Sequence, residues 1–361
     1  MLQPDDKSPP APAGLPFEKI WETRKDRSYT PGKVVKGLLG SVPLTVLNYS
    51  STRARSFVSD LLKAGTFDSV QFGGEHLFPY IETVRAAPGR PPLVLDWHNV
   101  ESELMSRYAD ESTSLPRRLI ARRTAHLLRK IELQSLERCD AHTVVSQRER
   151  ADLLARNSRP EIHVVPNGVD IAAYTSGTHS SPRTLLFVGS MDYHANVDAV
   201  TWFAREAWPA MAHRFPHLEF TVVGRSPSRE VQMLASDRIR ITGTVDDVRP
   251  YYSNALALIV PLRVGGGTRL KILEAMAMGV PVISTTIGAE GIAVTDGHNI
   301  LLADSAKQML AALDRIVSQP GLHRDLAEAG RRLVSENYDW TSIGNRLYDI
   351  HLRLIRAREQ R

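Results

Sequence analysis

Uninterrupted apolar segments alternate with amphipathic ones along most of the chain, and this alternation constrains the fold more than any other feature. In the C-terminal half, segments such as TLLFVGS, LEFTVVG and ALALIVPL are apolar at successive positions, which is typical of strands buried on both faces. Helical periodicity separates them. The pattern predicts a parallel sheet covered by helices, with strands at 184–190, 218–224, 239–245, 255–262 and 281–286 and helices at 196–216, 268–279, 305–318 and 321–337.

The N-terminal half follows the same pattern after about forty residues in which prolines argue against regular structure. Residues 171–183 are small and polar, which indicates a linker. We therefore expect an α/β protein with two doubly wound, Rossmann-like domains that face a cleft. The expected parts are an N-terminal domain at 1–170, the linker at 171–183, a C-terminal domain at 184–337 and a final helical segment at 338–361, with N-terminal strands at 67–74, 92–100, 141–146 and 162–170 and helices at 56–65, 101–111, 116–140 and 146–157.

Composition excludes several classes of protein. The 361 residues are enough for about two domains, and 42% hydrophobic with 24% charged residues is ordinary for a globular chain. Cys139 is the only cysteine, so a disulfide scaffold is excluded. The formal charge of +5 permits anionic ligands without requiring nucleic acid, so no nucleic-acid partner is expected. Without a secretory segment or an apolar run of about 20 residues, we expect a cytoplasmic protein.

The strongest candidate site follows the strand at 255–262, because ligands of parallel sheets bind beyond the carboxyl ends of the strands. Consecutive glycines there let the backbone approach a ligand closely, and the helix expected to begin near Thr268 offers unpaired N–H groups to phosphate. The alternative is a tight turn with a solvated basic edge. The candidate binding residues are Arg263, Gly265, Gly266, Gly267, Thr268, Lys271 and Glu274.

Two weaker candidate sites follow other strands. Gly189, Ser190 and Asn196 come after the strand at 184–190, although an ordinary capped helix start would explain them equally well. His98 follows the strand at 92–100, and a histidine suits hydrogen bonding or proton transfer near neutral pH. A purely structural histidine is the alternative.

Several common cofactor motifs are missing from the sequence. It contains no cysteine–histidine cluster with zinc spacing, no G-x-x-x-x-G-K-[ST] phosphate loop and no G-x-G-x-x-G dinucleotide fingerprint. It also has no G-x-S-x-G nucleophile elbow. We therefore expect neither a bound metal nor a resident cofactor.

Several of these segments resemble glycosyltransferase family 4, also called group 1. The resemblance rests on VPNGVD at 165–170, FVGSMDYHANVDA at 187–199, VPLRVGGGTRLKILEAMAMGVPVIST at 260–285 and GAEGI at 288–292. It covers the chain from about residue 40 to the end, and the branch linked to bacterial exopolysaccharide assembly is the most similar.

The resemblance implies the GT-B fold and a retaining transfer of sugar from a UDP- or GDP-linked donor, without an obligatory metal. The acceptor would be a glycan or a lipid-linked molecule in polysaccharide or cell-envelope synthesis. By position, His98 matches the histidine near the transferred sugar, and Glu274 matches the second glutamate of the Glu-x7-Glu motif, which binds ribose. Gly265–Thr268 match the loop around the donor, and the last helix would cross back to the first domain.

Three departures from the family pattern bear on activity. Gly266 stands where the motif has its first glutamate, and Ser190 and Asn196 lie where the family often has arginine and lysine. Lys271, assigned with His98 as catalytic, or Arg263 would then supply the missing charge. The opening strand, glycine loop and helix are expected to be missing. A non-catalytic or truncated nucleotide-sugar-binding paralogue and a GT-B sugar-nucleotide epimerase are therefore alternatives.

A basic amphipathic segment spans residues 116–130. One interpretation is a helix that contacts the inner face of the membrane near a lipid-linked acceptor. The other is a solvated charged face. Its basic residues are Arg117, Arg118, Arg122, Arg123, Arg129 and Lys130.

Overall fold

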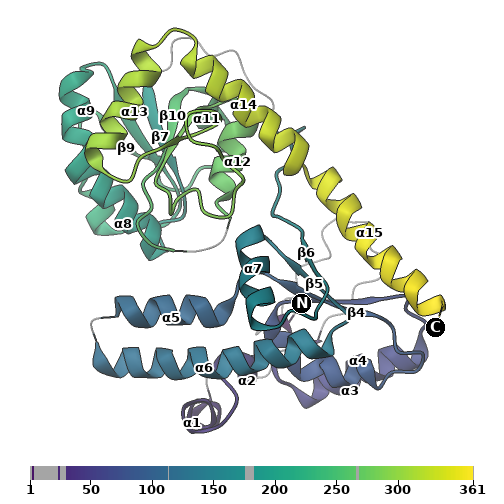
Figure 1. The fold of residues 1–361 in the computed structure, drawn as a ribbon. Helices are drawn as coiled ribbons and strands as arrows, with labels where there is room; N and C mark the ends of the chain where they lie inside the picture. The colour runs from purple at the N-terminus through teal and green to yellow at the C-terminus, as the bar shows by residue number, and fades with distance from the viewer. Residues whose placement is uncertain are drawn as a thin grey trace. The chain divides into compact units, whose positions relative to one another are not determined.

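The computed structural model describes residues 2–3, 23–24, 30–112, 114–174, 183–265 and 268–360 (Figure 1). The chain divides into two compact units: unit 1 is Met1–Val164 with Tyr348–Arg361, and unit 2 is Val165–Leu347. Each contains one main parallel sheet between helices, which confirms the α/β class with two Rossmann-like domains. The division after Val164 precedes the predicted linker, residues 175–182 of which lie outside the described part. The cleft stays a prediction.

The sheet of unit 1 has four parallel strands in the order β3-β4-β5-β6. Each falls within a segment where the apolar pattern predicts a strand. Apolar side chains on β4 are buried on both sides of the sheet, as expected for a central parallel strand. The strands are β3 (Val70–Gly73), β4 (Leu93–Trp97), β5 (Ala141–Val144) and β6 (Ile162–Val164).

The helices of unit 1 include several that the sequence pattern does not predict. The prolines before residue 40 argue against regular structure, yet Pro31 occupies the start of α1, where a missing N–H costs nothing. The predicted N-cap at Ser146 is confirmed, since its hydroxyl accepts from the Glu149 N–H. The helices are α1 (Pro31–Leu39), α2 (Leu44–Tyr49), α3 (Thr52–Ala64), η1 (Glu75–Tyr80), α4 (Ile81–Arg85), α5 (Glu101–Glu111), α6 (Leu115–Arg138) and α7 (Gln147–Arg156).

The expected absence of an opening strand, loop and helix stays a prediction. It concerns residues before Thr30, of which the structure describes only two short paired strands, β1 (Leu2–Gln3) and β2 (Thr23–Arg24).

The sheet of unit 2 has six parallel strands in the order β12-β11-β10-β7-β8-β9. β7 and β10 are neighbours at its centre and are almost entirely buried. All the predicted strands of this half are present, and β12 is additional. The strands are β7 (Thr184–Val188), β8 (Glu219–Val223), β9 (Ile239–Ile241), β10 (Ala255–Val260), β11 (Val282–Ser284) and β12 (Leu301–Leu302).

Helices lie on both sides of the unit 2 sheet, with α8 and α9 on one side and α12 on the other (Figure 1). The single helix predicted at 196–216 is wrong in detail, because a π-helical turn, η2, interrupts it just before Pro209, which has no N–H to donate. The helices are α8 (His194–Trp202), η2 (Phe203–Ala207), α9 (Trp208–Arg214), α10 (Arg229–Gln232), α11 (Arg249–Ser253), α12 (Leu270–Ala277), α13 (Ala306–Ser318) and α14 (Leu322–Asn337).

The last helix, α15 (Trp340–Glu359), begins in unit 2 and ends in unit 1. In unit 1, the His351 ring nitrogens lie 2.9 Å from Ser69 Oγ and 2.9 Å from Gln71 Oε1, beside β3. Ile350 is buried there as well. These contacts attach the end of α15 to the N-terminal sheet.

Candidate active site

Two of the three predicted candidate sites meet at the carboxyl edge of the unit 2 sheet: the one after β7, and the one formed by the loop after β10 with α12. β7 and β10 are parallel neighbours, so Gly189 after β7 and the loop after β10 emerge at the same edge. α12 begins from that loop. Lys271 and Glu274 are three residues apart on α12 and therefore share one face of the helix.

Lys271 is the charged centre of this edge. Its Nζ donates to Asn196 Oδ1 over 3.0 Å and lies 4.2 Å from the centre of the Phe187 ring. Asn196 in turn donates from Nδ2 to the Ser190 carbonyl oxygen over 2.8 Å. A Cβ on Gly189 would lie 2.8 Å from Lys271 Nζ and 2.8 Å from Asn196 Nδ2, so a larger residue there would displace this pair. The structure thus brings together four residues that the sequence predicts, namely Gly189, Ser190, Asn196 and Lys271.

Burial is the main cause of the unusual titration of Lys271. It lowers the pKa of the ammonium to about 7, with a further contribution from Arg269, while Glu274 acts in the opposite direction. The lysine is therefore a cation whose charge responds to an incoming anion near neutral pH.

Glu274 is held by two tyrosines that the sequence analysis did not select. Tyr252 is fully buried and its hydroxyl donates to Glu274 Oε2 over 2.8 Å. Burial, together with the charge of Glu274 and a hydrogen bond to it, raises the pKa of Tyr174 to about 12. The same causes raise the pKa of Tyr252. Both phenols thus remain protonated donors that orient the carboxylate.

Arg263, the other candidate cation, has different partners from Lys271. Its guanidinium makes a two-pronged ion pair with Asp198 on α8, with Nε 3.0 Å from Oδ2, and it lies 5.7 Å from the Trp202 ring centre. It also lines a cavity of about 650 Å³ against α8. The charge of Arg263 is therefore already paired with a carboxylate, whereas Lys271 donates to the neutral amide of Asn196.

The loop before α12 differs from expectation at its end. Gly265 has φ +114°, a conformation that favours glycine. The helix begins at Leu270 rather than near Thr268, because Arg269 before it has an extended backbone. The hydroxyl of Thr268 is buried and finds no hydrogen-bond partner among the described residues. Gly266 and Gly267 lie outside the described residues.

Ser190 belongs to a polar cluster that includes Arg225, another residue missed from sequence. The Ser190 hydroxyl donates to Asp192 and accepts from Arg225 Nε over 2.9 Å, and Arg225 Nη2 lies 3.3 Å from Asp192 Oδ2. Arg225 comes just after β8, so the rule of inspecting strand ends could have found it.

His98 lies at the corresponding edge of unit 1. It follows β4, its side chain is 62% exposed, and its Nε2 lies 3.5 Å from Asp96 Oδ2. The other oxygen of Asp96 accepts from Thr143 Oγ1 over 2.7 Å. A Cβ on Gly73, at the end of β3, would lie 3.6 Å from His98 Nε2. His98 is thus accessible, and it lies near Asp96 of its own strand β4, which Thr143 of the neighbouring strand β5 holds in place.

Behind His98, unit 1 buries carboxyl groups that the sequence analysis did not select. Glu132 on α6 is fully buried and accepts from Ser102 N over 2.8 Å, from Ser102 Oγ over 2.5 Å and from Arg156 Nη1 over 2.6 Å. Burial raises the pKa of Glu75 to about 7 and also raises the pKa of Glu101, with Glu132 contributing to both shifts.

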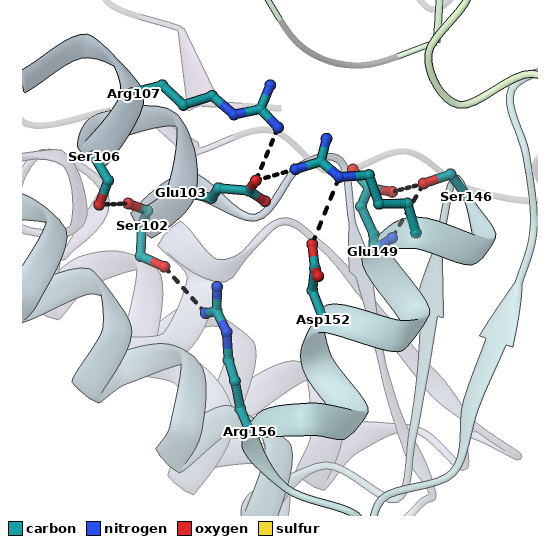
Figure 2. Close-up of polar contacts among 9 residues, drawn as sticks. Ser102, Glu103, Ser106, Arg107, Ser146, Glu149, Asp152 and Arg156 are labelled. Carbon is teal, nitrogen blue, oxygen red and sulfur yellow. Dashed lines mark hydrogen bonds and ion pairs between the residues drawn. The ribbon is translucent and has the colours of Figure 1, made fainter. Parts of the chain in front are cut away.

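Polar contacts around the carboxyl group of Glu132 join three helices of unit 1. Figure 2 shows Arg156 reaching from α7 to the hydroxyl of Ser102 on α5, a contact of 3.1 Å. Glu103 on α5 pairs with Arg107 over 2.8 Å and with Arg148 of α7. The network connects α5, α6 and α7.

Comparison with known proteins identifies the fold. Residues 22–173 match the family model described as Glycosyltransferase Family 4, and residues 182–319 match the one described as Glycosyl transferases group 1. A sucrose-phosphate synthase from Thermosynechococcus elongatus has a similar structure, with TM-score 0.66 and 19% identity over 93% of this chain and 84% of that one. The chain has the GT-B glycosyltransferase fold.

Sequence relatives of this GT-B chain include two phosphatidyl-myo-inositol mannosyltransferases. The one from Propionibacterium freudenreichii is 30% identical over 223 residues, which is 58% of this chain and 55% of the relative. The one from Mycolicibacterium smegmatis is 29% identical over 52% of this chain and 50% of the relative. The chain thus spans about half the length of the curated relatives it matches.

Another similar structure is Anabaena HepE in complex with UDP and glucose, with TM-score 0.63 and 14% identity over 91% of this chain and 85% of that one. Among the described parts of this GT-B chain, no helix is long and apolar enough to cross a membrane.

Proposed function

We propose that this chain transfers a sugar from a UDP- or GDP-linked donor to an acceptor hydroxyl. Glycosyltransferase domains in both halves support the proposal. The observation that carries it is the position of Lys271, enclosed by Gly189, Asn196 and Phe187 at the carboxyl edge of the unit 2 sheet. An enclosed lysine in the first turn of a helix suits a diphosphate.

The donor diphosphate would take its counter-charge from the protein. The first N–H groups of α12 and the ammonium of Lys271 would stabilise the negative charge that grows on the leaving group. Because burial lowers the pKa of Lys271 to about 7, a bound anion would raise this pKa and hold the lysine protonated. Glu274, oriented by Tyr252, would accept hydrogen bonds from the nucleotide ribose.

The transfer would proceed with retention at the anomeric carbon. The bond from this carbon to the diphosphate oxygen breaks, the bond to the acceptor oxygen forms on the same face, and the acceptor proton passes to the departing diphosphate. No protein nucleophile is needed, and His98 would hydrogen-bond and orient the sugar. The anomeric configuration of the product, read by proton NMR, tests retention.

A lipid-linked or glycan acceptor in polysaccharide or cell-envelope synthesis fits the names of the relatives, which include phosphatidyl-myo-inositol mannosyltransferases and an uncharacterized protein of a Klebsiella pneumoniae cps region. We place the reaction in the cytoplasm at the inner membrane face. The start of α6 would contact the bilayer, because Leu119 there is 65% exposed among arginines, and Leu39 at the end of α1, which Arg123 joins to α6, is 81% exposed.

Arg123 would not bind lipid, because its guanidinium is already engaged within the protein. It donates to the Gly37 and Gly40 carbonyls over 3.1 Å and 2.5 Å and so attaches α1 to α6. Sedimentation with vesicles tests the membrane contact. Binding should rise with anionic lipid content and fall in Leu119→Glu, and binding that ignores anionic lipid content would reject it.

The decisive test removes one cation at a time. With UDP- and GDP-sugars, Lys271→Ala should lose at least about tenfold in donor affinity, since a hydrogen bond to a charged group contributes about 1.5–3 kcal/mol. Arg263→Ala is the matched control, because Asp198 already pairs with that arginine. Transfer that persists in EDTA would support the proposed independence of metal.

Other outcomes would contradict the proposal. Donor binding without hydrolysis or transfer to any acceptor would indicate a non-catalytic nucleotide-sugar binder. Recovery of an epimerised donor sugar would indicate an epimerase. Unchanged donor affinity in Lys271→Ala would remove the role assigned to that residue.

A further inference from the structure

Unit 2 has a second cavity, at the edge of its sheet opposite to Lys271. Its volume is about 810 Å³, within the roughly 300–1,000 Å³ usual for small-molecule sites. Arg183 comes just before β7 and Leu218 just before β8, so the cavity lies at the amino ends of strands whose carboxyl ends carry the candidate active site. We name it the amino-edge cavity.

The wall of the amino-edge cavity is mainly apolar. It is formed by side chains from the loop after α9, from β10 and from α13, including Phe215, Leu256 and Ile316. Val317 on α13 faces the same space and is 51% exposed, although α13 buries its other apolar face in the core. An apolar concavity with an exposed valine favours a ligand with an apolar part.

The remaining lining residues are largely basic. Arg183, Arg214, His217, His323 and Arg324 contribute to the cavity, and no aspartate or glutamate occurs among its described lining residues. Arg214 pairs with Asp314 over 3.2 Å, and Arg324 lies 3.8 Å from Asp325. Arg183 makes no ion pair with any residue that the structure describes. Arg324 also lies 3.9 Å from Glu328, so these carboxylates offset the charges of Arg214 and Arg324, and it is the charge of Arg183 that favours a ligand with an anionic head.

We propose that the amino-edge cavity binds a single-chain amphiphile with an anionic head group, such as an alkyl phosphate. The chain would cover Phe215 and Val317, and Arg183 would pair with the head group. The site is separate from the nucleotide site, because the two lie at opposite ends of the same strands. The proposal does not depend on the function proposed above.

Calorimetry on the full chain with octyl phosphate, below its micelle concentration, tests the proposal. We expect one saturable site, with affinity at least about tenfold higher than for octanol, octylamine or inorganic phosphate. Ala327→Trp, which fills the cavity, should weaken octyl phosphate binding at least about tenfold. Arg183→Gln should weaken octyl phosphate and leave octanol unchanged.

Exposed positions elsewhere in unit 2 provide controls. Ala235→Trp adds the same bulk and Arg229→Gln removes the same charge outside the cavity, and both should bind as the wild type does. If Ala327→Trp does not fold, Val317→Trp fills the cavity from its exposed side. Octyl phosphate affinity that is unchanged in the filled variant, or is equalled by octylamine or inorganic phosphate, would overturn the proposal.

Discussion

The carboxyl edges of the two sheets differ in the titratable groups whose pKa values are shifted by burial. In unit 1, Glu75, Glu101 and Glu132 lie at or behind the strand ends, and among the residues that the structure describes only Glu132 of these three has a close arginine partner, Arg156. In unit 2, the corresponding edge holds the half-buried Lys271, whose pKa is lowered by desolvation, three residues from Glu274 on the same helix. Both sheets are parallel and both edges follow the same geometric rule. The difference therefore arises from the side chains.

This difference predicts that the two edges favour different ligands. A buried lysine with a lowered pKa favours an anion, which suits the donor diphosphate. Buried carboxyl groups with raised pKa values disfavour an anion and suit the hydroxyl groups of a sugar. Variants of these groups can test whether the two edges differ as the charges indicate.

The largest expected effect is on the stability of unit 1, when its buried ion pair between Glu132 and Arg156 is broken. Glu132→Ala leaves Arg156 with an uncompensated charge and should lower the free energy of unfolding of unit 1 by about 3–5 kcal/mol. Hydrogen exchange of the β4 and β5 amides measures this. Glu82→Ala breaks the exposed pair with Arg138 and should cost at most about 1 kcal/mol. Equal losses in both variants would show that Glu132 is not a buried structural charge.

The next largest effect is the change in donor affinity with pH. In the proposed site, Lys271 would bind a diphosphate only when protonated, and its pKa is about 7, so donor affinity should fall toward high pH, by up to about tenfold per pH unit well above 7. A nucleotide sugar is the suitable probe, since its diphosphate does not titrate there. Titration calorimetry from pH 6 to 9 should show this slope in the wild type and lose it in Lys271→Met. A slope retained in Lys271→Met would assign it to another group.

Stability should respond to pH with opposite signs in the two units. Glu75 has a pKa of about 7 in the folded state and 4.5 as its ordinary value, so folded unit 1 holds the extra proton and loses stability as pH rises from about 4.5 to 7. Lys271 has a pKa of about 7 against 10.5, so the unfolded chain holds the extra proton and unit 2 gains stability as pH rises from about 7 to 10.5.

Glu75→Gln should remove the loss in unit 1, on the order of 2 kcal/mol, and leave the gain in unit 2. Hydrogen exchange resolved by unit measures both slopes. Slopes of the same sign in the two units would contradict the comparison.

The smallest expected effect serves as a calibration. Ser146 caps α7 in unit 1 and Ser305 caps α13 in unit 2, each accepting over 3.3 Å from the backbone N–H three residues later. Replacing either serine with alanine should cost about 1 kcal/mol in its own unit only. A loss that appears in both units would show that the units unfold together, and the slopes would then need to be read from the whole chain.

The alternation of apolar strands and amphipathic helices was sufficient to predict every strand of the two main sheets except β12. The rule about strand ends led to Gly189, Asn196 and Lys271, which the structure brings together. The same reasoning missed α1, because it weighed the prolines before residue 40 and not the compatibility of Pro31 with a first helical turn. It also missed Tyr252 and Glu132, which are not at strand ends.

The sequence by itself determined the order of strands and helices, because burial of apolar side chains imposes a periodicity that short segments reveal. Only the tertiary structure decided which partner each cation has. Lys271 meets Asn196, 75 residues away, whereas Arg263 meets Asp198, 65 residues away. The two cations look alike in sequence, and only folding brings each to its partner, because side-chain pairing depends on distances in space that local periodicity does not encode.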